Sequence, residues 1–89
     1  MQTTSLLAYE SIQKTKHTVR DNILELFDAF GAMSDYELIT LYKEHVTEKI
    51  VDSTVRTRRS ELVDEGLLRD SGLHHVLPTG REAIVWEVV

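Results

Sequence analysis

Apolar residues recur every three or four positions from Val19 to Phe30, with polar residues between them. In a helix, this spacing places the apolar residues on one face and the polar residues on the other. Gly31 follows directly, and glycine commonly ends helices because it tolerates a left-handed backbone. We therefore predict a first helix of about a dozen residues that ends at Gly31.

A second amphipathic stretch follows Ser34. Ser34 and Glu37 have the spacing of a capping box, in which each side chain accepts a hydrogen bond from the other residue's backbone amide. The apolar face that comes next consists of Leu38, Leu41, Tyr42 and either His45 or Val46. Residues 46–52 contain neither glycine nor proline, and we interpret them as the end of this second helix and a turn.

The third stretch, residues 53–67, combines hydroxyl, basic and apolar positions. It opens with Ser53, whose hydroxyl is able to cap a helix, and closes with Gly66, which is able to end one. We predict a third helix over residues 54–65. At 100° per residue, its core side consists of Val55, Leu62 and Val63.

The helical spacing stops after Gly66. Ser71-Gly72 is a turn signal, and Pro78-Thr79-Gly80 is a second one. Between and after them lie an apolar run, Leu73–Leu77, and a segment rich in β-branched residues, Arg81–Val89. We predict a hairpin whose last strand has Ile84, Trp86 and Val88 on one face, and we interpret Trp86 as a core anchor beneath that hairpin.

Three helices followed by a hairpin predict an α+β fold, mainly α, of the winged helix-turn-helix class. In such a fold a three-helix core carries the C-terminal hairpin as its wing. We place this domain at residues 18–89, with a tiny extra strand at Ala32-Met33. Residues 1–17 are expected to form a short N-terminal helix or an arm, because Leu6, Tyr9 and Ile12 are spaced three apart.

Length and composition limit the classes of protein to consider. The 89 residues suffice for one domain with a modest core, and the 42% hydrophobic and 28% charged residues are typical of globular chains. The absence of cysteine excludes disulfides and thiolate metal sites. We expect no secretory signal and no membrane association, and we expect the protein to be in the cytoplasm of a bacterium or host cell.

Charge is distributed unevenly along the chain, and the net value is −5. Residues 21–52 carry eight acids against two lysines, whereas residues 53–89 carry five arginines against six acids. Salt screens charges beyond about 8–10 Å, so a basic face can act despite a distant acidic one. The acidic total nevertheless favours a protein partner over a nucleic acid.

Three arginines in the third helix suggest that it binds the phosphate backbone and base edges of DNA. Arg56 is the candidate for base recognition, Arg58 for a flanking phosphate, and Arg59 faces the core side and is predicted to pair with a carboxylate of the acidic middle segment. Long donors and hydroxyls on the exposed N-terminal face of a helix are suited to the major groove. The predicted DNA-binding residues are Ser53, Thr54, Arg56, Thr57, Arg58 and Ser60 in the helix, and Thr79 and Arg81 in the turn of the wing.

The segments Thr54-Val55-Arg56, Glu61-Leu62 and Glu65-Gly66-Leu67 resemble the third helix of winged helix-turn-helix regulators of the GntR and MarR types. The chain is also similar, over nearly its whole length, to small winged-helix proteins of bacteriophages and prophages. The matching segments are Ala8–Ile12, Val55–Leu67, Asp70-Ser71-Gly72, Thr79-Gly80-Arg81 and Ala83–Trp86. The resemblance implies a phage or prophage transcriptional regulator that binds double-stranded DNA. One departure is Leu73–Leu77, which is more apolar than the basic wing strand expected for these proteins.

A second function stays open, namely a winged-helix module that binds a protein, as a host-protein inhibitor or a component of a replication complex. The net charge of −5, the acidic segment and the apolar Leu73–Leu77 all favour it. A homodimer is a further alternative, because a single small domain rarely binds DNA with high specificity alone.

Catalysis and metal binding are not expected. His74 and His75 are adjacent on a predicted strand and so point to opposite faces, which prevents them from sharing an ion. No serine stands in a glycine-flanked nucleophile elbow. We therefore predict neither enzyme activity nor a cofactor.

Overall fold

The computed structural model describes residues 18–89, so the predicted N-terminal arm or short helix lies outside the described residues. The described part has an α+β fold, about half helical, with three helices and three strands. In chain order the elements are α2 (Val19–Phe30), β1 (Met33–Ser34), α3 (Asp35–His45), α4 (Asp52–Asp64), β2 (Leu68–Val76) and β3 (Glu82–Val88). The strand predicted at Ala32-Met33 is thus present, displaced by one residue.

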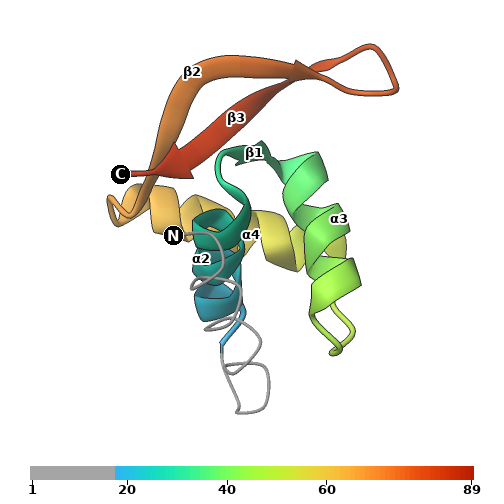
Figure 1. Cartoon of the computed structure of the whole chain (residues 1–89), viewed down its shortest axis with the longest axis vertical. Coiled ribbons are helices and arrows are strands. Elements are labelled where there is room, and N and C mark those ends of the chain that lie inside the picture. Colours follow the sequence, from blue (N-terminus) through green and yellow to red (C-terminus); the bar gives the residue numbers. More distant parts are fainter. Residues whose placement is uncertain (1–17) are drawn as a thin grey trace.

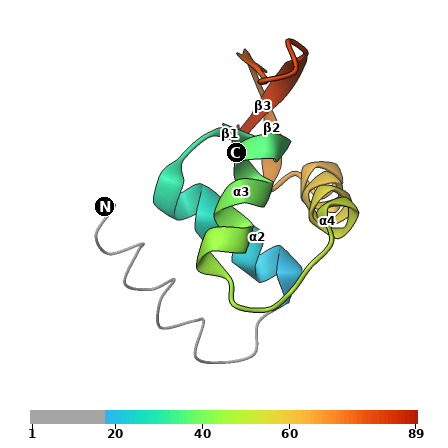
Figure 2. The same ribbon diagram turned by 90° about the vertical axis from the view of Figure 1, so that its right-hand side faces the viewer.

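The three strands form one antiparallel sheet in the order β1-β3-β2. Figures 1 and 2 show the helices gathered on one side of the sheet, with the far end of the β2–β3 hairpin extending beyond them. Met33 pairs with Trp86, so the short β1 joins the base of the hairpin to the helical part. This order of elements is consistent with the layout of a winged helix-turn-helix.

Helix α2 begins and ends, and α3 begins, where the sequence pattern predicts. The end of α3 was predicted within residues 46–52, but α3 already ends at His45, and Asp52 belongs to α4. Thr18 caps α2, and its hydroxyl accepts a hydrogen bond from the Asp21 amide. Gly31 ends the helix at a φ of 84°, which favours glycine. At α3 the predicted capping box is confirmed: the Glu37 amide donates to Ser34 Oγ at 3.3 Å, and the Ser34 amide donates to Glu37 Oε1 at 3.0 Å.

The predicted start of the third helix was wrong. α4 begins at Asp52, and its N-cap is Val51, which has an extended backbone and makes no side-chain capping bond. The Val51 carbonyl accepts from the Thr54 amide at 3.0 Å, so the first turn forms before the Ser53 hydroxyl could cap it. Ser53 is left exposed inside the first turn.

The predicted stop at Gly66 is confirmed. Gly66 has a φ of 81°, its amide donates to the Val63 carbonyl at 3.0 Å, and the Leu67 amide donates to the Leu62 carbonyl at 2.9 Å. Together these bonds form a Schellman motif, which satisfies carbonyls that the end of the helix would otherwise leave unpaired.

The Ser71-Gly72 segment is not the turn that the sequence predicted. It is an irregularity inside a continuous β2, where the pairing with β3 is interrupted between Asp70 and His74. The amides of Gly72 and Leu73 donate instead to Asp70 Oδ1 at 2.8 Å and Ser71 Oγ at 3.1 Å. Local side chains thus satisfy the amides that the ladder leaves unpaired, and the strand bends without ending.

Gly72→Ala is expected to lower the free energy of unfolding by about 1 kcal/mol, because Gly72 has a φ of 86°. A Cβ at this position meets no atom within 4 Å, so the loss is conformational and not steric. Gly72→Asn is the matched control and should lose less, since asparagine tolerates a left-handed backbone better. Urea unfolding measures both, and equal losses for the two variants would contradict this account.

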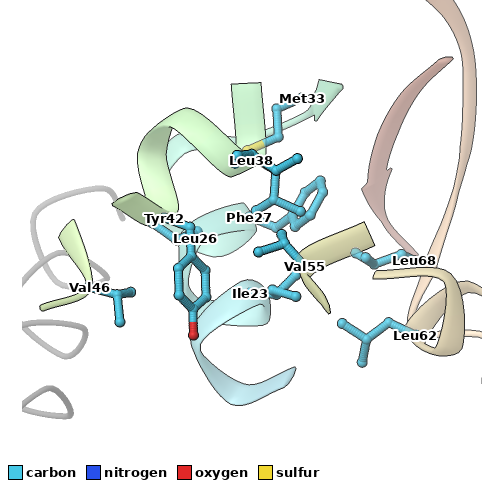
Figure 3. Packing of buried hydrophobic residues seen from close by; sticks show 11 residues of the cluster. Ile23, Leu26, Phe27, Met33, Leu38, Tyr42, Val46, Val55, Leu62 and Leu68 are labelled. Carbon is cyan, nitrogen blue, oxygen red and sulfur yellow. The ribbon is translucent and has the colours of Figure 1, made fainter. Parts of the chain in front are cut away.

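The core lies between the three helices and the base of the sheet (Figure 3). Val55 and Leu62 of α4 are fully buried and Val63 is half-buried, as the predicted core side requires. Trp86 packs against this core from the central strand, which confirms it as an anchor beneath the hairpin. The buried apolar cluster consists of Ile23, Leu26, Phe27, Met33, Leu38, Ile39, Tyr42, Val46, Val55, Leu62 and Leu68.

Candidate nucleic-acid interface

The outer face of α4 lies opposite its buried residues and carries small hydroxyls beside one arginine. Ser53, Thr57 and Ser60 are exposed on this face, and Arg56 is exposed at its flank. Thr54, also predicted as a contact, is half-buried. The exposed side chains in the N-terminal half of α4 can therefore form hydrogen bonds with a molecule outside the chain.

Arg56 makes no ion pair within residues 18–89. The nearest acid on its own helix, Asp52, is paired with Lys43 at 2.6 Å between Nζ and Oδ1. The hydrogen bond from Lys43 holds the pKa of Asp52 below its ordinary value, and the charges of Lys43 and Arg56 add to this effect. Asp52 is therefore ionised at neutral pH and engaged by Lys43, which leaves the hydrogen-bond donors of Arg56 available.

Arg58 lies on the other flank of α4, beside α2. Its Nη1 is 3.2 Å from Glu61 Oε2, and it lines a hollow together with Val19 and Leu24 of α2. Arg56 instead lines a hollow formed with α3 and the hairpin. The two arginines thus occupy opposite flanks, as the helical spacing predicts, and the phosphate contact of Arg58 stays a prediction.

Arg59 makes the internal pair that the sequence predicted. Its Nε and Nη2 donate to the two carboxylate oxygens of Asp35 at 2.7 and 2.8 Å. The Arg59 and Asp35 side chains are only 13% and 22% exposed. The guanidinium carbon also lies 4.1 Å from the centroid of the Trp86 ring, within the range of a cation–π contact.

The predicted residues of the wing, Thr79 and Arg81, are exposed in the connection between β2 and β3. The connection is closed by the Leu77 amide, which donates to the Arg81 carbonyl at 2.7 Å, and by the Gly80 amide, which donates to the Leu77 carbonyl at 2.8 Å. Arg81, like Arg56, makes no ion pair with another of the described residues. This end of the hairpin is the part that extends beyond the helices in Figures 1 and 2.

One hollow lies between α4 and the end of the β2–β3 hairpin. It has a volume of about 490 Å³ and is lined by Arg56, by Tyr36 and Thr40 of α3, and by Leu77 and Ala83 of the hairpin. Tyr36 is about half exposed. The residues that line this hollow therefore connect Arg56 of α4 with the β2–β3 hairpin.

His75 is a structural contact that sequence reasoning missed. Its Nδ1 lies 3.1 Å from Ser34 Oγ and 3.9 Å from Glu37 Oε1. These contacts hold β2 against the N-terminus of α3. No signal in the sequence spacing could find them, because residues 34 and 75 are brought together only by the sheet.

Comparisons with protein-family models, curated proteins and solved structures gave no match to this chain. Within residues 18–89, no cluster of three or more histidine, aspartate or glutamate side chains is placed to hold a metal ion. None of the helices described is both long and apolar enough to cross a membrane.

Proposed function

We propose that this chain is a winged helix-turn-helix protein that binds double-stranded DNA, with α4 in the major groove and the β2–β3 hairpin as the wing. The observation that carries the proposal is the outer face of α4. There Arg56 lies beside the exposed hydroxyls of Ser53, Thr57 and Ser60 and has no carboxylate ion pair in the described part of the chain.

The chemistry of this face matches what DNA offers. An arginine bonds guanine through two parallel hydrogen bonds, and serine and threonine bond either bases or phosphates. Thr79 and Arg81 at the hairpin end would bind the backbone beside the groove. Asp35 and Asp52, which line the hollow beside Arg56, are paired with Arg59 and Lys43, which reduces their repulsion of phosphates.

The biological role that we propose is transcriptional regulation in a phage or prophage. The support for it is the resemblance of residues 55–67, 70–72, 79–81 and 83–86 to small winged-helix proteins of that origin. The cytoplasm of the bacterial host is the compartment that this role implies.

Arg56→Ala is expected to weaken the binding of a duplex selected from a random library by about 1–3 kcal/mol and to relax the preference at one base pair. Gel shifts at several salt concentrations measure this, and affinity of the wild type should fall steeply as salt rises. Arg69→Ala is the matched control, because Arg69 is exposed at the other end of the hairpin and pairs with Glu87. Equal affinities for wild type and Arg56→Ala would rule out this role of Arg56.

Binding to a protein is the second candidate, and exposed apolar residues on the hairpin favour it. Leu73 and Val76 are 66% and 65% exposed, and Ile84 is 36% exposed. The pairs His74–Ile84 and Val76–Glu82 place Val76 and Ile84 at neighbouring positions of the sheet. A protein partner on this surface would be lost in Val76→Asp, whereas DNA binding through α4 would remain.

A further inference from the structure

We infer that Arg59 is a positioning residue of the DNA-binding surface, which fixes the wing relative to α4 without contacting DNA. The inference rests on the proposed function. Arg59 lies on the inner side of α4 and is 13% exposed in its side chain, so it is not available to a ligand on the outer face.

Arg59 joins three elements through one planar group. The edge of its guanidinium donates two hydrogen bonds to Asp35, the first residue of α3, and its carbon lies 4.1 Å from the centre of the Trp86 ring in β3. Among the described residues, no other polar contact joins α4 to the sheet. The hairpin has two further anchors, the pairing of β3 with β1 at Trp86 and the contact of His75 with Ser34, and neither connects it to α4.

The position of Trp86 makes this contact consequential at the wing tip. Trp86 lies in the central strand, five residues after the tip residue Arg81, and five residues of extended chain span about 17 Å. Rotating the hairpin by about 10° at Trp86 would move Arg81 by about 3 Å, which is the whole length of a hydrogen bond. We therefore expect a rotation of this size, caused by a change at Arg59, to remove the Arg81 contact while the contacts of α4 remain.

Lysine cannot replace arginine in this role. A lysine keeps the positive charge, but it has neither two parallel donors for hydrogen bonds to Asp35 nor a planar group that can stack on Trp86. Arg59→Lys thus leaves the net charge of the surface unchanged and alters only the geometry. Arg59→Lys is therefore more informative than a substitution that removes the charge of Arg59.

The test is a double-mutant cycle measured as duplex affinity. Arg81→Ala should weaken the wild type about tenfold, and should weaken Arg59→Lys by less than about twofold, because the wing contact is already lost. Arg56→Ala should weaken both backgrounds about tenfold. Arg59→Lys should also lower the slope of log affinity against log salt by about one phosphate contact, which a purely structural role would not do in a folded variant.

Each outcome has one meaning. If the wild type binds duplex DNA and Arg81→Ala weakens wild type and Arg59→Lys equally, the positioning role is wrong and the proposed function stands. If the wild type shows no salt-dependent binding to any duplex, both proposals fall.

Should circular dichroism show Arg59→Lys to be unfolded, Trp86→Phe replaces it in the cycle. That variant keeps an aromatic ring in the sheet but reduces the face on which the guanidinium lies, and an Arg81→Ala effect of full size in it would overturn the inference.

Discussion

Arg59→Ala is expected to lower the free energy of unfolding by about 2–3 kcal/mol. Removing one partner of a fully buried ion pair costs about 3–5 kcal/mol, because the remaining charge stays desolvated. Asp35 keeps partial access to water at 22% exposure and lies in the first turn of α3, where the helix dipole favours an acid. The expected loss is therefore smaller than for a fully buried pair, and it includes the lost contact with Trp86. Urea unfolding of the pure protein measures it.

Arg58→Ala is the matched control for this prediction. Arg58 is the adjacent residue in the same helix, but its pair with Glu61 is about 40% exposed on both sides and spans three residues. Such surface pairs contribute about 0.3–0.5 kcal/mol. If Arg58→Ala and Arg59→Ala destabilised the protein equally, the pair with Asp35 would not have the structural role assigned to it.

Phe27→Ala is expected to have the largest effect on stability, a loss of about 3–5 kcal/mol in the free energy of unfolding. Phe27 is 2% exposed and packs in the middle of the cluster shown in Figure 3, among side chains from α2, α3 and α4. Replacing Phe27 by alanine removes apolar contacts and leaves a cavity between α2, α3 and α4. The three helices can fill this cavity only by moving together. A domain of this size has about 5–15 kcal/mol of stability, so the variant should melt far below the wild type.

Phe30→Ala provides the comparison for that loss. Phe30 ends the same helix three residues later, but it is 41% exposed and contacts only the ring of His45 among the aromatic side chains described. Its truncation should cost less than about 1 kcal/mol. A Phe30→Ala loss as large as that of Phe27→Ala would show that the core does not lie where the burial of Phe27 indicates.

Those parts of the fold that depend on local chemistry could be predicted from the sequence. Gly31 and Gly66 end helices because each supplies a positive φ that other residues disfavour, and Ser34 with Glu37 caps α3 because both side chains reach backbone amides within one turn. The core side of α4 followed from helical spacing alone. In each case the deciding interaction joins residues close in sequence.

The wrong predictions at Ser53 and Ser71-Gly72 have different physical origins. Both have the residue types of a cap or a turn, but a backbone bond inside α4 forms before the Ser53 cap, whereas pairing with β3 continues β2 beyond Gly72. The Val51 carbonyl starts α4 two residues early, and the pairing of His74 with Ile84 continues β2 past the bend. The Ser71-Gly72 signal coincides with an irregularity in the strand, where Gly72 has a φ of 86°, but the pairing that resumes beyond it could not be predicted.

The candidate site could be predicted only in part, because some of its contacts depend on how separate elements pack together. The inward position of Arg59 follows from helix geometry, so a carboxylate partner could be expected, whereas the identity of Asp35 and Trp86 depends on how three elements pack. The contact of His75 with Ser34 is likewise fixed by the sheet. The uneven charge distribution also gains a physical meaning, since Asp35 and Asp52 from the acidic segment are paired with Arg59 and Lys43.

The most direct test of DNA binding is an amide-resolved NMR titration of the whole chain with a duplex selected from a random library at low salt. The proposed function predicts that shift changes concentrate at Ser53, Arg56, Thr57 and Ser60 of α4 and at residues 79–81 of the wing, and that added salt reverses them. A titration with no change at α4, or with changes confined to the apolar residues around Leu73 and Val76, would contradict it.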